Sequence, residues 1–227
     1  MFLSLSKFVL PITLFFTAAA SAGVEIGGTR IIYNGKNNQA AISVSNPDNS
    51  PYLIQSWISK NENGDDSDET FATTPPLFKL TPQAQNSVRV MLAGNTLPND
   101  RESVYWLNIK AIPTSSPDAQ NELLIAIKSK MKVLYRPAGL KGDPSLAWQQ
   151  LAFKSENGKL TIHNPTPYSV SLYELTINGK QIAKPPMVLP FQNMALPHSV
   201  AAGSAISWRA INDYGGITPE HKYTIRI

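Results

Sequence analysis

The sequence contains no cysteine, which excludes disulfide bonds, thiolate metal sites and thiol catalysis. Histidine is scarce too: the three residues His163, His198 and His221 lack the H-x-x-x-H or H-E-x-x-H spacing that brings two imidazoles to one metal ion. Charged residues make up 16% of the chain, and the formal net charge is only +4, spread without a long basic block. These shortages argue against a nucleic-acid partner, and we expect neither a metal nor another cofactor.

Long apolar runs are also lacking, except at the N-terminus. There Lys7 precedes an apolar stretch at 8–16, and small residues follow up to Ala22. Because the stretch is interrupted by Pro11 and is shorter than the roughly 20 residues of a membrane span, it is typical of a secretory signal peptide cleaved after Ala22. We therefore expect residues 1–22 to be a signal peptide, and the mature chain to be exported without membrane insertion.

The pattern that is present is alternation of apolar and polar residues in short segments separated by Gly, Pro, Asn and Asp. This pattern predicts antiparallel β-strands, and no segment has a convincing helical stripe of more than two turns. The clearest candidate strands are residues 24–33, 40–46, 52–58, 87–92, 104–112, 159–164, 168–177 and 223–227. The turns ENGK (156–159) and INGK (177–180) are natural hairpin tips.

The number of strands exceeds what one seven-stranded sandwich of about 100 residues holds. A segment rich in proline and glycine, RPAGLKGDPS at 136–145, interrupts the middle of the mature chain. The sequence thus predicts an N-terminal domain at 23–142 and a C-terminal domain at 143–227.

The four tryptophans are divided evenly between these domains. We expect Trp57 and Trp106 in the first core and Trp148 and Trp208 in the second. The acidic segment NENGDDSDE at 61–69 lacks the glycine and distal glutamate of a calcium loop, so a solvated hairpin tip is the better interpretation.

An unusual strand begins in the segment NELLIAIKSKMKVLYRPAG, residues 121–139. Leu123, Ile125 and Ile127 share one face of an extended chain, whereas Leu124 and Ala126 share the other, so both faces are apolar. Two interpretations remain open: an interior strand buried in its own domain, or an edge strand left uncovered for a partner.

A second unusual residue is Arg30. It has the parity of Val24, Ile26 and Ile32, so strict alternation places its guanidinium on the apolar side of the strand. Because an unpaired buried charge is costly, Arg30 must find an anion or emerge into a cleft.

Several segments together resemble one family. They are GTRIIY, YLIQSW, TPPLF, DRESVYWLNIKAIP, KMKVLYRPAGL, NPTPYSVS and INDYGG, in this order between residues 28 and 216. The ordered set is similar to the periplasmic chaperones of chaperone–usher pilus assembly. This resemblance implies an all-β fold with two immunoglobulin-like β-sandwich domains joined at an angle, and a cleft between them. It further implies a periplasmic, non-enzymatic protein that binds, folds and caps pilus or fimbrial subunits by donor-strand complementation and delivers them to an outer-membrane usher.

The resemblance also implies roles for individual residues. The donor strand comprises Leu123, Ile125 and Ile127. Arg30 and Lys132 together anchor the C-terminal carboxylate of the subunit; the alternative is that Lys132 belongs to a solvated series with Lys128 and Lys130. Because Lys132 and Ile127 have opposite parity but address one client, we expect a bulge or a marked twist between them.

A third set implied by the resemblance is an ion network of Glu102, Arg136 and Asp213 that bridges the domains and sets the cleft angle. Three independent surface charges are the alternative. The connection from Pro113 to Glu122 is short and resembles the short-loop subclass that serves rod-like pili.

Other functions are weighed against the chaperone. A pilus structural subunit usually has a cysteine pair and a penultimate tyrosine, whereas this chain has no cysteine and ends in Arg226-Ile227. An exported immunoglobulin-like structural or glycan-binding protein of a surface fibre is the other alternative. No carboxylate pair, nucleophile elbow or histidine-centred constellation suggests hydrolysis. Self-capping of the free chaperone as a dimer also remains open.

Overall fold

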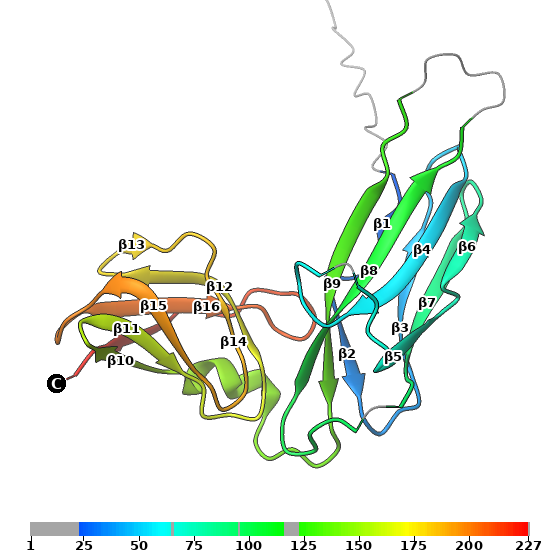
Figure 1. The fold of residues 1–227 in the computed structure, drawn as a ribbon. Helices are drawn as coiled ribbons and strands as arrows, with labels where there is room; N and C mark the ends of the chain where they lie inside the picture. The colour runs from blue at the N-terminus through cyan, green and yellow to red at the C-terminus, as the bar shows by residue number, and fades with distance from the viewer. Residues whose placement is uncertain (1–22, 65, 95, 116–122, 227) are drawn as a thin grey trace, which may run out of the picture.

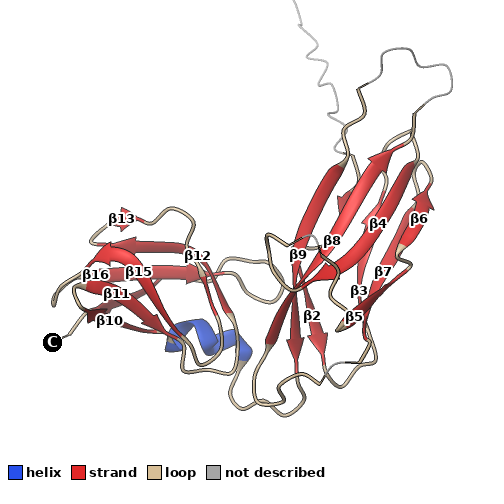
Figure 2. Cartoon of the chain, viewed as in Figure 1, coloured by secondary structure: helices blue, strands red, loops and turns tan. Residues whose placement is uncertain are grey.

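The computed structural model describes residues 23–64, 66–94, 96–115 and 123–226, so the predicted signal peptide at 1–22 lies outside the described residues. Within these ranges nearly all regular structure is β-strand, as Figure 2 shows, and the helical exception is the short 3-10 helix η1 (Pro144–Gln150). The strands form two bodies set at an angle (Figure 1). This arrangement confirms the all-β fold with two sandwich domains. No helix among the described residues has the length and apolar character needed to span a membrane.

The N-terminal domain packs two sheets face to face. The smaller sheet has the order β1 (Glu25–Ile26), β3 (Ala40–Ser45), β7 (Gln85–Leu92) and β5 (Phe71–Thr74). The larger has the order β2 (Arg30–Asn34), β9 (Ile127–Arg136), β8 (Ser103–Pro113), β4 (Tyr52–Ser59) and β6 (Leu77–Leu80). Their inner faces bury a common core that includes Val44, Val88 and Leu107, none of which is accessible to solvent.

The C-terminal domain repeats the sandwich plan. One sheet comprises β10 (Ala152–Glu156), β11 (Lys159–His163) and β15 (Asn193–Ser199). The other has the order β13 (Lys180–Gln181), β12 (Val170–Ile177), β16 (Ala205–Ala210) and β17 (His221–Thr224), with β14 (Met187–Val188) paired to β12. Phe153 and Trp208 lie at its centre, with their ring centroids 4.5 Å apart.

Both predicted hairpin tips are present in this domain. Asn157 and Gly158 join β10 to β11, and Asn178 and Gly179 join β12 to β13; all four have positive φ angles. Two successive left-handed residues are the requirement of the type I′ turn, which explains the Asn-Gly pairs.

The segment 24–33 was expected to be a single strand, but it divides between the two sheets. β1 pairs with β3, whereas β2 pairs with β9. Between them Gly27 lies so close to the Ser43 side chain that a Cβ atom would force the Ser43 hydroxyl to move. Since the chain changes sheets here, residue parity is not conserved. Tyr33 faces the core and Arg30 faces away from it, so the prediction that Arg30 lies on the apolar side is wrong.

Trp148 and Trp208 belong to the second core, as predicted. Trp57 and Trp106 do not belong to the first core, and that prediction is wrong. In β8 the alternation places Leu107 in the core, so Trp106 faces the outer side of the sheet, where it is buried near the second domain. Trp57 lies on the same outer face, directly opposite Asn108.

The acidic segment 61–69 was expected to form a hairpin tip, but it joins β4 to β5, which belong to different sheets. Its described residues are mostly exposed, in agreement with the predicted solvation.

Candidate functional site

The apolar residues that precede and begin β9 are strongly exposed. The exposed fraction is 83% for Leu123, 65% for Ile125 and 57% for Ile127. An interior strand would bury these side chains, so the interior-strand interpretation is wrong. Exposure of so much apolar surface is unusual for a protein that is not bound to a partner.

The backbone of this region is also incompletely paired. β9 pairs with β8 along 127–135, but its parallel pairing with β2 covers only 132–136. Within the described part of the chain, the other edge of residues 127–131 therefore has no strand beside it. Ile125 and Ile127 line an opening of about 250 Å³ next to Ile26 at the end of the core (Figure 1 shows β9 and β1 here).

No bulge separates the apolar residues from Lys132. The β8–β9 ladder is regular from Ala111 opposite Ile127 to Ser103 opposite Tyr135, so the expected bulge is absent. Ile127 lies on the face that continues into the core, and Lys132 lies on the face toward the C-terminal domain. The two features address different sides of one strand.

Arg30 and Lys132 are direct neighbours in the parallel pairing of β2 with β9. Each also contacts the C-terminal domain. The Arg30 Nη1 donates to the carbonyl oxygen of Ile211 at 3.1 Å, and the Lys132 Nζ donates to Ser171 Oγ at 3.2 Å. The Lys132 Nζ lies 5.5 Å from the centroid of the Trp106 ring. The cation pair is thus positioned by both domains at their junction.

Neither cation has an ion-pair partner among the described residues, and the Arg30 Nε is buried without a hydrogen-bond acceptor. Burial lowers the pKa of Arg30, with partial compensation by Asp213. Burial, followed by repulsion from Arg30, lowers the pKa of Lys132. An incoming carboxylate would relieve both effects.

The three lysines on this face of β9 differ in their surroundings. Lys128 is exposed, and Lys130 donates to the carbonyl oxygens of Glu62 at 2.5 Å and Gly64 at 3.3 Å. Lys132 is partly buried. It is therefore not one member of a uniformly solvated series.

Glu102, Arg136 and Asp213 form a contiguous ion network. The Arg136 Nε lies 2.7 Å from Glu102 Oε1, and its Nη1 and Nη2 donate to the two Asp213 oxygens at 2.8 and 3.0 Å. The second Glu102 oxygen accepts from the Ser169 backbone N–H at 2.8 Å. Since Glu102 and Arg136 come from the N-terminal domain and the other two residues from the C-terminal domain, the network joins the domains.

The network is closed to solvent around Glu102, whose side chain has no exposed surface. Burial raises the pKa of Glu102, and Arg136 opposes this rise only in part. Burial lowers the pKa of Arg136, but its contacts with Asp213 and Glu102 outweigh burial, so the pKa lies above its usual value. Burial thus shifts mainly the ionisation of the Glu102 carboxyl, whereas the Arg136 guanidinium has carboxylate partners on both sides.

The residues of the C-terminal domain that contact Arg30 and Lys132 were not singled out in the sequence. Ser171 and the Ile211 carbonyl hold the cations, and the Ile211 N–H donates to the Ser171 carbonyl at 2.9 Å. A backbone acceptor has no sequence signal, and a serine in an alternating strand is common. Within the described ranges, no three carboxylate or imidazole groups gather in a way that could hold a metal ion.

Comparison with known proteins identifies the architecture. Residues 23–141 match the family described as "Pili and flagellar-assembly chaperone, PapD N-terminal domain", and residues 146–222 match "Pili assembly chaperone PapD, C-terminal domain". The chain belongs to the pilus-assembly chaperones.

Relatives within this family cover nearly the whole chain. Chaperone protein FimC of Escherichia coli K12 is 42% identical over 206 residues, covering 88% of this chain and 84% of FimC. Probable fimbrial chaperone LpfB of Escherichia coli O157:H7 is 40% identical over 218 residues, covering 92% of this chain and 93% of LpfB.

Solved structures give the same result. The structure of the Salmonella enterica SafA pilin in complex with the SafB chaperone matches with a TM-score of 0.80 and 34% identity, covering 92% of this chain and 99% of that one. The periplasmic chaperone SfaE matches with a TM-score of 0.74 and 37% identity, covering 90% and 100%. The family and fold inferred from the ordered sequence segments are confirmed.

Proposed function

We propose that this chaperone works in the periplasm, where it holds pilus or fimbrial subunits by donating the exposed edge of β9 to them and then delivers them to an outer-membrane usher. The observation that carries the proposal is the exposure of Leu123, Ile125 and Ile127, which precede and begin β9, next to a stretch of β9 that has no second strand beside it within the described part of the chain. The role is one of binding and requires no catalytic step.

The donor residues supply affinity. Exposed edge strands are usually protected by charge or proline because their backbone groups pair readily with other chains. A client that lacks one strand would pair with this edge and bury the apolar side chains. Full burial of each one contributes roughly 1.5–3 kcal/mol before ordering costs.

The cation pair supplies register. Arg30 and Lys132 lie at the point where the pairing of β9 with β2 begins, so an anion bound there marks a fixed position along β9. Two cations that converge on one carboxylate form short charge-assisted hydrogen bonds. The C-terminal carboxylate of the client is the ligand we assign to them. The ion network of Glu102, Arg136 and Asp213 fixes the angle at which the second domain meets this site.

The same edge suits a second copy of the chain when no client is present. Two copies that cover each other's apolar residues would protect them from nonspecific association. Self-capping as a dimer is therefore part of the proposal, and it predicts a dimer that dissociates when a subunit is added.

The test is periplasmic co-expression with the subunits encoded beside the chaperone gene, followed by co-purification. We expect Ile125→Asp to give a folded chaperone that leaves the subunits to proteolysis, because a carboxylate cannot be buried in an apolar groove. Leu146→Asp is the matched control, since Leu146 is 46% exposed in the other domain; it should retain wild-type capture.

Two results would contradict the proposal. One is wild-type recovery of subunits with Ile125→Asp. The other is unfolding of Ile125→Asp while Leu146→Asp remains folded, which would mean that Ile125 stabilises the chaperone itself.

A further inference from the structure

The turn between β14 and β15 has an unusual residue at its tip. In the sequence Leu189-Pro190-Phe191-Gln192, the Gln192 N–H donates to the Leu189 carbonyl at 3.3 Å, and Phe191 has a φ angle of +56°. This position of a proline-led turn normally holds glycine or asparagine. A bulky residue in the left-handed region is strained, and such strain is found mainly where function requires it.

Packing within the C-terminal domain does not explain the ring. Phe191 is 43% exposed and lies outside the buried core cluster. Its partner comes from the other domain: the Arg101 guanidinium carbon lies 5.1 Å from the Phe191 ring centroid. Arg101 is oriented by two hydrogen bonds to Asp100, at 3.0 and 2.8 Å. The geometry is that of a cation–π contact across the domain junction.

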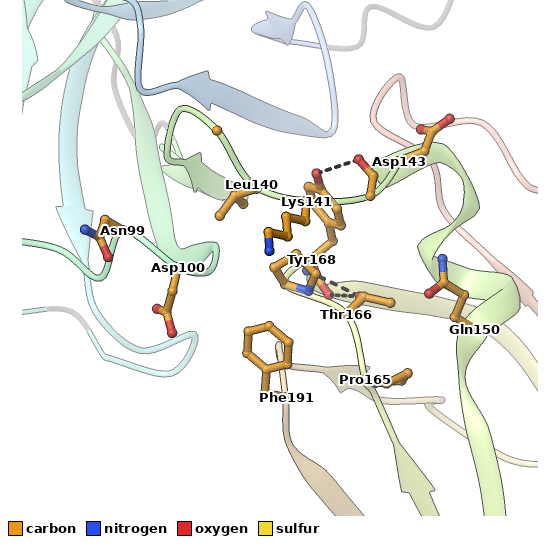
Figure 3. A pocket seen from close by; sticks show the side chains of 13 residues that line it. Asn99, Asp100, Leu140, Lys141, Asp143, Gln150, Pro165, Thr166, Tyr168 and Phe191 are labelled. Atoms are coloured by element: carbon orange, nitrogen blue, oxygen red, sulfur yellow. Dashed lines mark hydrogen bonds between the residues drawn. The ribbon is translucent and has the colours of Figure 1, made fainter.

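The contact lies between two hollows. Phe191 lines a pocket of about 490 Å³ beside the interdomain connection, and Arg101 lines another of about 430 Å³ that also includes Trp106. Figure 3 shows Phe191 and Asp100 approaching each other from the two domains across the first pocket. The Phe191–Arg101 contact thus bridges the domains between these hollows, next to the ion network that begins at Glu102.

The backbone of the Phe191 turn is held in place by hydrogen bonds from a buried side chain. The side chain of Asn164, which is fully buried, donates to the carbonyl oxygens of Tyr168, Val188 and Leu189 at 2.7, 3.1 and 3.2 Å. This amide ties the Phe191 turn to the loop that contacts the N-terminal domain, where the Glu102 N–H donates to the Pro167 carbonyl at 2.9 Å. Displacement of the turn backbone would therefore disrupt hydrogen bonds of the buried Asn164 side chain.

We infer that Phe191 is a positioning residue for client capture: its strained turn presents the ring to Arg101 and thereby, together with the ion network, sets the angle between the domains. The angle matters because Ile211 and Ser171 of the C-terminal domain hold the side chains of Arg30 and Lys132. This inference rests on the proposed function for its effect on capture, but not for its effect on domain orientation.

Three variants separate strain from orientation. Phe191→Gly and Phe191→Ala both remove the ring, but only glycine relieves the positive φ angle, so we expect a higher unfolding temperature for glycine than for alanine. Both should change the interdomain orientation of the client-free protein, measured by residual dipolar couplings and X-ray scattering. Both should weaken capture by about two- to fivefold, the range of an exposed cation–π contact. Phe191→Tyr should retain wild-type values.

Arg101→Ala tests the partner and should reproduce the change in orientation. Wild-type orientation in the alanine and glycine variants would overturn the inference, as would a change in them that Arg101→Ala does not share. If the wild-type protein captures no subunit, the proposed function fails, whereas the couplings of the client-free variants still decide the role of Phe191.

Discussion

Two groups of charged side chains lie at the junction of the domains, and they differ in whether their charges are matched. In the ion network, Arg136 contacts carboxylates on both sides, at 2.7 Å from Glu102 and 2.8 Å from Asp213. In the cation pair, Arg30 and Lys132 are adjacent, and within the described residues their side chains donate to neutral groups, the Ile211 carbonyl and the Ser171 hydroxyl. The positive charge of the ion network is balanced by carboxylates of the same chain, whereas the cation pair has a surplus of positive charge.

The shifts in pKa express the same difference. Interactions with carboxylates raise the pKa of Arg136 in spite of its burial, but the pKa values of Arg30 and Lys132 are lowered. Removing a charge from a matched buried group leaves the remaining charge uncompensated and destabilises the protein. Removing a buried charge that has no opposite charge beside it removes a desolvation penalty and does not destabilise the protein. The first group therefore stabilises the structure, whereas the second lowers its stability, as expected under our proposal that it is retained to bind a ligand.

The largest expected effect follows from breaking the matched group. Glu102→Ala should lower the free energy of unfolding by about 3 kcal/mol, the lower end of the range for a broken buried ion pair, because Arg136 still retains Asp213. Denaturant titration measures the loss. Scattering of the client-free protein should also show a broader distribution of domain angles.

Glu174→Ala is the matched control for this change. Glu174 lies 3.9 Å from Arg209 in a pair that is partly exposed to solvent, so its loss should leave the unfolding transition unchanged. Equal stability of the two variants would mean that the interdomain network contributes no more than a surface pair.

The next effect follows from breaking the unmatched group. Lys132→Met should weaken subunit binding by about 2–5 kcal/mol, the usual loss when one member of a buried charge contact is truncated. Its free energy of unfolding should equal or exceed that of the wild type, because a desolvated charge is removed and most of the side-chain volume is retained. Isothermal titration with a client's C-terminal peptide and denaturant titration measure the two quantities.

Lys159→Met, at an exposed position in the other domain, is the control and should change neither quantity. A Lys132→Met protein that is less stable than the wild type would show that Lys132 supports the fold, contrary to the comparison.

Much of this site was predictable, and the errors have a common physical origin. Alternation located many of the strands because one face of each is buried, but it did not single out β5, β6, β10, β15 or β16. Parity counting failed for Arg30, since the chain changes sheets at Gly27. In β8, Trp106 lies on the same face as Asn108 and Lys110. These polar neighbours could have indicated that the tryptophan faces outward.

Other features had no signal in the sequence. The bulge expected before Lys132 was inferred from the assumption that both parts of the site face one side, whereas the regular ladder places Ile127 and Lys132 on opposite faces of β9. The strained position of Phe191 depends on a turn whose sequence, Leu-Pro-Phe-Gln, does not disclose a positive φ angle. Local sequence patterns likewise do not predict contacts between domains. The ion network of Glu102, Arg136 and Asp213 was expected only from the family resemblance.

The smallest expected effect concerns the pH dependence of stability and of client binding. The pKa of Lys132 is lower in the folded protein than in the unfolded chain. Between these two pKa values the unfolded chain binds more protons, so the contribution of Lys132 to the free energy of unfolding rises with pH. Client affinity should move in the opposite direction, because it is constant below the lowered pKa and falls once Lys132 loses its charge.

Lys132→Arg isolates this residue from other groups that titrate at alkaline pH, since arginine remains protonated throughout. The difference in peptide affinity between wild type and Lys132→Arg should therefore begin to change with pH below the range of an ordinary lysine. A difference that stays constant up to that range would show that Lys132 is not desolvated in the client-free protein. Opposite slopes for stability and affinity are the signature of a charge that is maintained for binding, whereas a charge maintained for folding would give slopes of the same sign.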